Sequence, residues 1–317
     1  MRRHVSPDTT EYERLFGMVI FSVIIVTYNV KNYLNPALRS VETALLEIPH
    51  EIYVVDNAST DGSAPMVLEQ FPSVKLIELP ENIGFARANN IALKQAQGKY
   101  ISLLNPDTLV QQSTFPILLE AFEKYPEAGM VGCKILNEDG SLQLSCRRSI
   151  PTPWVAFTRL SGLSKLFSKS QLFARYHLTY LDPDETAEVE AISGSFMTIR
   201  REILDTVGYL DERFFMYGED LDWCLRIRQA GWKILYYPKT NIIHYKGKSI
   251  IPYQWRHIKH FYEAMILFAE KHPQQVTRYI PLWIVKLSVW LSAIINIIWL
   301  KITHISYKRD TTCWIFF

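Results

Sequence analysis

Acidic residues that follow apolar runs are the most informative feature of this sequence. Asp56, Asp107 and the pair Glu219-Asp220 each come within three residues of the end of such a run. Carboxylate oxygens bind divalent cations together with phosphate oxygens, and an ionised carboxylate can remove a proton from a hydroxyl group. The pattern therefore indicates a site for a metal-bound phosphate beside a hydroxyl that loses its proton.

An alternation of strand and helix patterns must position these acids. The predicted strands are residues 18–26, 51–55, 74–78 and 100–104, and the predicted helices are 31–46, 63–71, 84–96 and 113–124. This order is typical of an α/β fold with a mostly parallel central sheet flanked by helices. Ligands bind such sheets at the carboxyl ends of the strands, so we expect Asp56 and Asp107 on one edge.

The alternation weakens after residue 130, and no secondary structure is predicted for residues 141–190. The later predicted elements are a strand at 191–199, a helix at 219–230, strands at 233–237 and 241–245, and an amphipathic helix at 253–271. Residues 1–17 are polar and are expected to form a flexible N-terminal arm.

Residues 280–300 form an apolar C-terminal segment that contains Trp283, Trp290 and Trp299. Its length approaches that of a membrane span, and tryptophan is typical of the membrane interface. Basic residues flank both ends, however, and a single span would carry one basic group across the bilayer. We therefore expect a helix that lies in the cytoplasmic face of the membrane. The alternative is a helix packed on the protein's own core or in a dimer.

Composition narrows the partners and the compartment. The net charge of +2 on 317 residues indicates no nucleic-acid partner. The four cysteines lack metal-ligand spacing and are expected to be reduced thiols in the cytoplasm: Cys133, Cys146, Cys224 and Cys313. The basic residues Arg2 and Arg3 are followed by no apolar run of the kind found in signal peptides.

Two motifs in the first half have both a binding and a structural interpretation. Asp56 could accept hydrogen bonds from a ribose hydroxyl or a base N–H group, or it could form an Asx turn that caps the next helix. Gly84 allows close approach of a phosphate to the backbone at a helix N-terminus. Alternatively, Gly84 belongs to a tight turn in which Asn82 caps the helix.

The remaining polar candidates also have two interpretations. Asp107 could bind Mg²⁺ with diphosphate oxygens, or cap the helix predicted at 113–124. His244, after an apolar strand, is either a metal ligand or a structural histidine. The Glu219-Asp220 pair lies in the first turn of a predicted helix. One of its carboxylates could be a general base, or both could simply complement the helix dipole.

Taken together, these stretches resemble the family 2 glycosyltransferases of the GT-A fold, and in particular the bacterial rhamnosyltransferase-like enzymes. The matching motifs, in the order of the family, are Val23-Ile24-Ile25-Val26-Thr27-Tyr28-Asn29, Val55-Asp56-Asn57, Asn82-Ile83-Gly84-Phe85-Ala86, Leu103-Leu104-Asn105-Pro106-Asp107, Ser193-Gly194-Ser195 and Gly218-Glu219-Asp220-Leu221-Asp222. They cover about residues 20–250.

The resemblance implies a catalytic domain at 18–250, with a donor half at about 18–135 and an acceptor half at about 136–250. C-terminal helices would follow at 251–317. The donor would be a nucleotide sugar, a dTDP- or UDP-sugar, and its binding residues would be Thr27, Tyr28, Asn29, Asp56, Asn57, Asn82, Gly84, Asn105 and Asp107. A saccharide or lipid-linked acceptor would be bound by Gly194, Ser195, Asp222 and Trp223.

The same resemblance implies an inverting single displacement. Asp220, with Glu219 beside it, would take the proton of the acceptor hydroxyl. Asp107 corresponds to the metal-binding acid of the family's D-x-D motif, whose first Asp is Asn105 here, and His244 would complete the site for Mg²⁺ or Mn²⁺. The product would be cell-surface polysaccharide, made by an enzyme held peripherally at the inner face of the cell membrane.

Two other classes of protein remain in view. A nucleotidylyltransferase would normally carry a glycine-rich basic loop after its first strand, and residues 27–31 contain no glycine. A non-catalytic scaffold is disfavoured because Asp56, Asp107 and Asp220 are all present.

Overall fold

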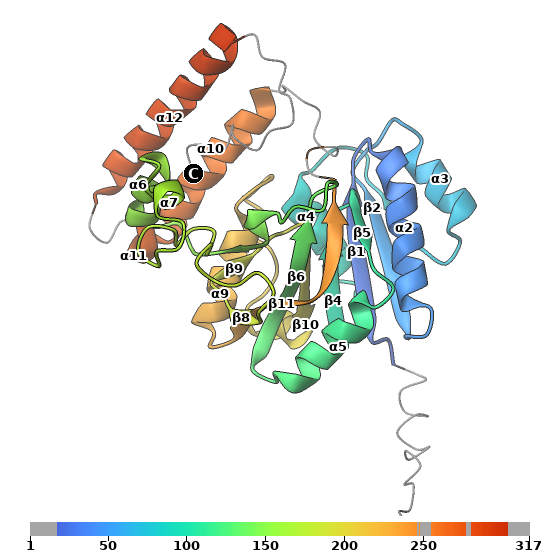
Figure 1. Cartoon of the computed structure of the whole chain (residues 1–317). Coiled ribbons are helices and arrows are strands. Elements are labelled where there is room, and N and C mark those ends of the chain that lie inside the picture. The colour runs from blue at the N-terminus through green and yellow to red at the C-terminus, as the bar shows by residue number, and fades with distance from the viewer. Residues whose placement is uncertain (1–17, 246, 248–254, 277–279, 304–317) are drawn as a thin grey trace, which may run out of the picture.

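The computed structural model describes residues 18–245, 247, 255–276 and 280–303. The arm predicted at residues 1–17 lies outside this part of the chain. Figure 1 shows a central sheet with helices on both faces and a separate pair of long C-terminal helices. The fold is therefore mixed α/β, as the alternation of elements predicts.

The first half of the chain builds a parallel sheet. Strands β1 (Phe21–Thr27), β2 (His50–Asp56), β3 (Lys75–Glu78) and β4 (Tyr100–Leu104) pair in the order β3-β2-β1-β4, and all three pairings are parallel. Every residue of β1 is buried, because β1 is central and both faces of the sheet are covered. The connecting helices are α2 (Lys31–Leu45), α3 (Ser63–Gln70) and α4 (Phe85–Leu93).

The second half extends the same sheet with antiparallel pairs. Beyond β4 the order is β10 (Phe196–Arg200), β6 (Ala128–Leu136), β11 (Lys233–His244) and β5 (Thr108–Val110), while the short β8 (Ala187–Glu188) pairs with β11. Strand β10 is antiparallel to both β4 and β6, and β11 is parallel to β6. By this arithmetic β11 runs in the direction of β1, so His244 ends at the same edge as Thr27 and Asp56.

Several boundaries differ from the sequence predictions. The two strands predicted at 233–237 and 241–245 are one strand, β11, with a register shift between Tyr236 and Asn241. The strand predicted at 191–199 is divided at Gly194 into β9 (Ala191–Ile192) and β10. Strand β9 pairs with β7 (Arg147–Arg148) in a small second sheet, which no pattern predicted because each strand has only two residues.

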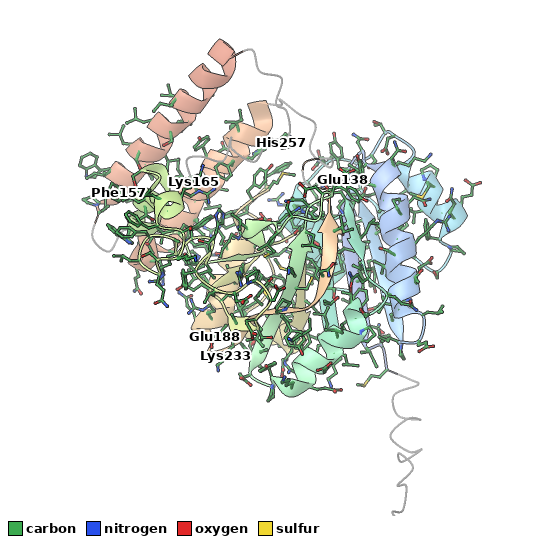
Figure 2. All side chains as sticks on the ribbon, viewed as in Figure 1. Glu138, Phe157, Lys165, Glu188, Lys233 and His257 are labelled. Atoms are coloured by element: carbon green, nitrogen blue, oxygen red, sulfur yellow. The ribbon has the colours of Figure 1, made fainter. Side chains whose placement is uncertain are left out.

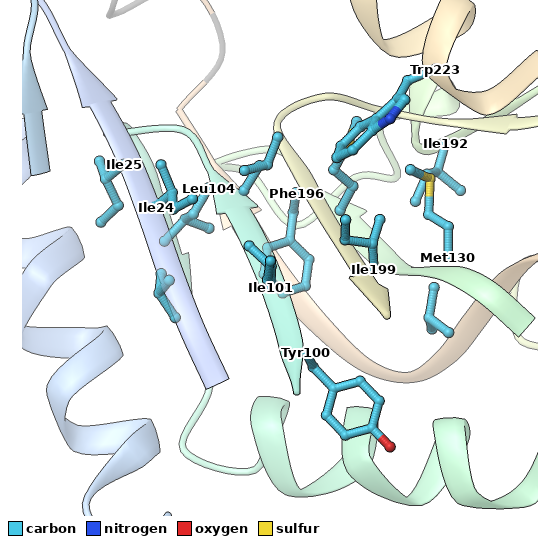
Figure 3. Close-up of a cluster of buried hydrophobic side chains, with 14 of the residues drawn as sticks. Ile24, Ile25, Tyr100, Ile101, Leu104, Met130, Ile192, Phe196, Ile199 and Trp223 are labelled. Atoms are coloured by element: carbon cyan, nitrogen blue, oxygen red, sulfur yellow. The ribbon is translucent and has the colours of Figure 1, made fainter. Parts of the chain in front are cut away.

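The other helices are α5 (Thr114–Lys124), α6 (Pro153–Leu160), α7 (Leu163–Leu166), α8 (Glu202–Thr206), α9 (Glu219–Gln229), α10 (Trp255–Lys271), α11 (Pro273–Val276) and α12 (Leu282–Thr303). Figure 3 shows how Ile24, Ile101, Phe196 and Trp223 form one buried core beneath the edge of the sheet. This continuous core anchors the strand ends that carry the polar residues.

Helices α10 and α12 pack against each other away from the sheet (Figure 1). Their contact is a small apolar cluster of Tyr262, Val289 and Ala293, with an ion pair of 2.6 Å between Lys286 Nζ and Glu270 Oε1. The opposite side of α12 exposes large apolar side chains, including Trp283 and Trp290. No helix in the described ranges has both the length and the apolar character needed to cross a membrane.

Candidate active site

The ends of β1 and β2 place Thr27 and Asp56 side by side. The two residues are register partners, and both are buried, at 1% and 3% exposure. Asp56 Oδ2 accepts a hydrogen bond from Ser59 N at 3.1 Å, which is the predicted Asx turn. Thr27 Oγ1 and Asp56 Oδ1 have no hydrogen-bond partner among the described residues. Buried polar atoms without partners are costly, so these two suit the hydroxyl and N–H groups of a ligand.

Asn29 links two loops at this edge. Its φ of 55° is a left-handed conformation that asparagine tolerates. Its Oδ1 accepts a hydrogen bond from Thr60 N at 2.7 Å, and its own N–H donates to Ser59 Oγ at 3.0 Å. The side chain therefore holds the loop that follows Asp56, whereas the neighbouring Tyr28 is 38% exposed.

Asn57 and Asn82 organise the turn at Gly84. Asn57 Oδ1 accepts from Ile83 N at 2.9 Å, and Asn82 Oδ1 accepts from Asn57 Nδ2 and Gly84 N, both at 3.0 Å. A Cβ on Gly84 would lie 2.6 Å from the carbonyl oxygen of Phe215, and φ is +90°. The close approach that requires glycine is thus made by the protein's own Phe215, and it fastens the donor half to the loop before α9.

Asp107 and His244 lie together because β5 pairs with the end of β11. Thr108 is the register partner of His244, and His244 Nε2 lies 3.3 Å from Asp107 Oδ1. Asp107 is fully buried, and His244 is 8% exposed. Adjacent ligands of an octahedral Mg²⁺ with bonds of about 2.1 Å are about 3 Å apart, so this separation fits two ligands of one ion.

Gln143 fixes the orientation of the His244 ring. Its amide Nε2 donates to the His244 carbonyl oxygen at 2.8 Å, so its Oε1 faces Nδ1, at 3.0 Å. Nδ1 therefore carries a hydrogen, and Nε2 points to Asp107. Metal-bound histidines usually have such an acceptor on the second ring nitrogen. Within the described residues, however, no group of three His, Cys, Asp or Glu side chains could hold a metal by itself. A metal here would need further ligands such as diphosphate oxygens.

Asp220 sits at the start of α9 and faces the loop at Gly194. Asp220 Oδ2 accepts hydrogen bonds from Gly194 N at 3.0 Å and from Arg148 Nη2, while Oδ1 accepts from Leu221 N at 2.7 Å. Although burial opposes it, the charge of Asp220 raises the pKa of Arg148 above its ordinary value. Each carboxylate oxygen has two lone pairs, so Oδ1 keeps one for a substrate.

Glu219 is buried beside Asp220 but in a different state. Burial, followed by the negative charge of Asp220, raises the pKa of Glu219 to about 8. Its Oε2 has no hydrogen-bond partner among the described residues. Glu219 is therefore mostly uncharged at neutral pH.

Asp222 and Trp223, predicted to contact the acceptor, are engaged inside the protein. Asp222 is fully buried and accepts from Arg226 at 2.9 Å and from Lys271 and His272 at 2.7 Å each. These bonds tie α9 to the end of α10 and help lower the pKa of Asp222 against the opposing effect of burial. Trp223 is also fully buried, and its indole N–H donates to Gly208 O at 2.9 Å. The contacts favour a structural role for both residues.

A single cavity of about 1620 Å³ adjoins most of these groups. The site residues that line it are Thr27, Tyr28, Asn57, Asn82, Gly84, Asn105, Gly194, Ser195, Glu219, Asp220 and His244. Ser195 is held by Asn105, whose N–H donates to the Ser195 carbonyl oxygen at 3.0 Å. Asp56 and Asp107 lie just beneath the lining. One face of the cavity is thus the carboxyl edge of the sheet, which we call the donor edge: Thr27, Asp56, Asp107 and His244.

Sequence reasoning missed Gln143, Arg148 and Phe215, which reach the site from segments without a recognisable motif. Gln143 and Arg148 fall in the stretch where no structure was predicted. The available signal was charge: residues 140–181 contain six Lys or Arg residues and no Asp or Glu.

Comparisons with known proteins agree with this geometry. The model of glycosyl transferase family 2 matches residues 22–208. The N-acetylglucosaminyl-diphospho-decaprenol L-rhamnosyltransferase of Mycobacterium tuberculosis is 29% identical over 265 residues, which are 80% of this chain and 85% of that relative. The poly-beta-1,6-N-acetyl-D-glucosamine synthase of Staphylococcus epidermidis is 26% identical over 73% of this chain and 50% of its own length.

Solved structures support the fold. Staphylococcus aureus TarS 1–349 in complex with UDP-GlcNAc has a TM-score of 0.56 at 20% identity, covering 93% of this chain and 75% of that one. The mannosyltransferase PcManGT of Pyrobaculum calidifontis, in complex with GDP-Man and Mn²⁺, has a TM-score of 0.54 at 19% identity, covering 86% and 68%. The family model spans more than half of the chain and includes the strand ends that form the donor edge. The chain therefore belongs to glycosyl transferase family 2.

Proposed function

We propose that this glycosyltransferase moves a sugar, with rhamnose favoured, from a nucleotide-diphosphate donor to a hydroxyl of a lipid-linked or free saccharide. The observation that carries the proposal is one cavity that joins the donor edge to Asp220. The printed activity of the mycobacterial relative, a rhamnosyltransferase acting on a diphosphate-linked lipid, supports the choice of sugar and acceptor.

The donor edge suits a nucleoside diphosphate. Thr27 Oγ1 and Asp56 Oδ1 would accept hydrogen bonds from the nucleoside, because both are buried and without a partner in the described chain. Asp107 and His244 would hold a divalent cation with the diphosphate. When bound, that cation would stabilise the negative charge that grows on the departing diphosphate.

Asp220 suits the role of general base better than Glu219. A base must be ionised before it takes a proton, and Glu219, with a pKa of about 8, is mostly protonated at neutral pH. Asp220 forms an ion pair with Arg148, and its Oδ1 retains a lone pair beside the cavity. The acceptor hydroxyl would give its proton to Asp220 while its oxygen attacks the anomeric carbon, which inverts the configuration there.

Attachment to the cytoplasmic face of a membrane is the remaining part of the proposal. The exposed side of α12 carries Trp283, Leu287, Trp290, Leu291 and Ile294. Residues 271–309 contain no acidic residue, which favours contact with anionic lipid. A helix of this kind would bring the cavity close to a lipid-linked acceptor.

A screen of nucleotide sugars tests the proposal. The purified full-length chain would be incubated with each dTDP- and UDP-sugar and Mg²⁺ or Mn²⁺, with and without a lipid-linked acceptor, and release of the nucleoside diphosphate would be measured. We expect acceptor-dependent release from one donor, with dTDP-rhamnose as the favoured candidate. Formation of a nucleotide sugar from a sugar phosphate would instead indicate a nucleotidylyltransferase, and no turnover with any donor would indicate a scaffold.

A further inference from the structure

The wall of the cavity opposite the donor edge is basic. It is formed by residues 140–181, which we call the basic wall, and the lining includes its side chains Arg148, Arg159, Lys165 and His177. Among the described residues that line the whole cavity, the only acids are Glu219 and Asp220. The lining therefore has an excess of positive charge at a distance from the donor edge.

Arg148 is built into this wall with one donor left over. Its Nη2 donates to Ile192 O at 2.8 Å and to Asp220 Oδ2, and its side chain is 12% exposed. Its Nε–H is buried and has no hydrogen-bond partner among the described residues. A guanidinium group with an unused inward donor suits an oxygen-rich anion.

Arg159 is held close by, on α6. Its guanidinium group lies 4.7 Å from the centre of the Tyr176 ring, and Nη1 lies 3.1 Å from His177 Nε2, to which it donates. Burial, together with the positive charge of Arg148 and against the influence of Tyr176, lowers the pKa of Arg159. Two like charges that disfavour each other in a buried wall become more favourable when an anion lies between them.

The outer end of the basic wall is apolar. Phe157 lines the cavity from α6, and Ile284, Val285 and Val289 line it from α12. Figure 2 shows Phe157 and Lys165 on the side of the molecule formed by α6, α7 and α12. A ligand that passes from Asp220 along this wall therefore meets polar side chains first, then cations, and then apolar side chains.

We propose that Arg148, Arg159 and Lys165 bind the diphosphate of a lipid-linked acceptor, at a subsite separate from the donor diphosphate. This inference rests on the proposed function and deepens it, because it names the class of acceptor. The sugar would face Asp220, the diphosphate would contact the basic wall, and the lipid would leave between α6 and α12.

A binding experiment tests the subsite with a chemically simple probe. The full-length protein would be saturated with UDP or dTDP and Mg²⁺ to occupy the donor edge, and titrated calorimetrically with a short-chain prenyl diphosphate. The prenyl alcohol of the same length is the control ligand. We expect the diphosphate to bind more tightly than the alcohol, and Arg159→Gln to weaken it by about 10-fold or more. Arg159→Lys should retain part of the affinity.

The matched control variant is Arg175→Gln. Arg175 belongs to the same segment, but it is exposed and pairs with Glu190 at 2.9 Å, and it is not part of the lining. Equal affinity of Arg159→Gln and Arg175→Gln for the diphosphate would overturn the proposal. So would displacement of the probe by the nucleotide, since the probe would then occupy the donor edge.

Two further arms separate other causes. Binding to anionic phospholipid vesicles should be similar in Arg159→Gln and wild type, and loss of vesicle binding with unchanged affinity for the probe would assign the arginine to lipid headgroups and overturn the subsite. Acceptor-independent release of nucleoside diphosphate from a donor sugar should persist in Arg159→Gln. If wild type turns over no donor yet binds the probe as described, the proposed function fails while the subsite stands.

Discussion

The donor edge and the basic wall face each other across one cavity, but they are built in different ways. The donor edge consists of short polar motifs at the ends of buried strands, where backbone register fixes each side chain. Thr27 and Asp56, for example, are register partners on adjacent strands. The basic wall is assembled from two-residue strands, short helices and loops, and it is held by bonds between residues far apart in sequence, such as Arg148 with Asp220. We infer that the nucleotide site is constrained by the fold, whereas the acceptor site is free to vary around it.

The strongest test of where the two regions meet is Asp220→Asn. An amide cannot accept the hydroxyl proton, so we expect turnover to fall by about 10²–10⁴-fold. Donor affinity should change little, because Asp220 lies on α9, outside the donor edge. Steady-state kinetics and direct binding of the nucleotide sugar measure the two effects. Glu219→Gln is the matched control, and greater loss of turnover in that variant would move the base to Glu219.

Asp107→Ala probes the donor edge alone. Removing a carboxylate that would bind the cation should weaken Mn²⁺-dependent binding of UDP or dTDP by roughly 10²-fold or more. The measurement is nucleotide affinity with Mn²⁺ and with a chelator, and Asp139→Ala in an exposed turn is the control. Unchanged affinity of the wild type in the chelator would show that no metal is required.

Gln143 connects the two regions, since it lies in the basic wall and holds His244 of the donor edge. Gln143→Leu removes both hydrogen bonds to His244 and should lower the affinity for Mn²⁺ in the presence of nucleotide by about 10–100-fold. Titration followed by electron paramagnetic resonance measures it. Gln111→Leu, which loses an exposed bond to Asn241, is the control. Equal Mn²⁺ affinity in the two variants would leave the Gln143 bonds with a purely structural role.

The outer side of α12 should matter for the membrane and not for the donor. Replacing Trp283 and Trp290 with serine should reduce binding to anionic vesicles roughly 10-fold, because two large apolar side chains no longer enter the interface. Co-sedimentation measures it, with the exposed Leu68→Ser on α3 as the control. Wild-type vesicle binding by the double variant would mean that α12 serves another contact.

The smallest expected effect concerns stability and pH. The pKa of Glu219 in the folded chain is about 8, above the ordinary 4.5, so the folded state holds this proton more tightly than the unfolded state. The resulting stabilisation is complete below about pH 4.5 and is lost as the pH rises through 8. Glu219→Gln should therefore gain about 1 kcal/mol of unfolding free energy over the wild type per pH unit between pH 5 and 8. Urea denaturation across this range tests it, with the exposed Glu123→Gln as the control. A difference that does not change with pH would contradict the raised pKa.

The contrast between the two regions also explains what the sequence could predict. The parallel strands and their polar ends were visible because apolar runs of β1, β2 and β4 are long and each is followed by a turn motif. The role of Gly84 was not, since the carbonyl group that approaches it belongs to Phe215, 131 positions away along the chain. Likewise, the burial of Asp222 depends on Lys271 and His272 of a distant helix. Local patterns predict strand ends, but they do not show which distant segments cover them.

The most direct test of the account is the anomeric configuration of the product. The full-length chain would be supplied with the donor selected in the screen and a lipid-linked or prenyl-diphosphate saccharide acceptor, and the product would be examined by NMR. A single displacement assisted by Asp220 predicts a new glycosidic bond whose configuration is opposite to that of the donor. Retention of the donor configuration would contradict the account, because it would require two successive displacements at the anomeric carbon.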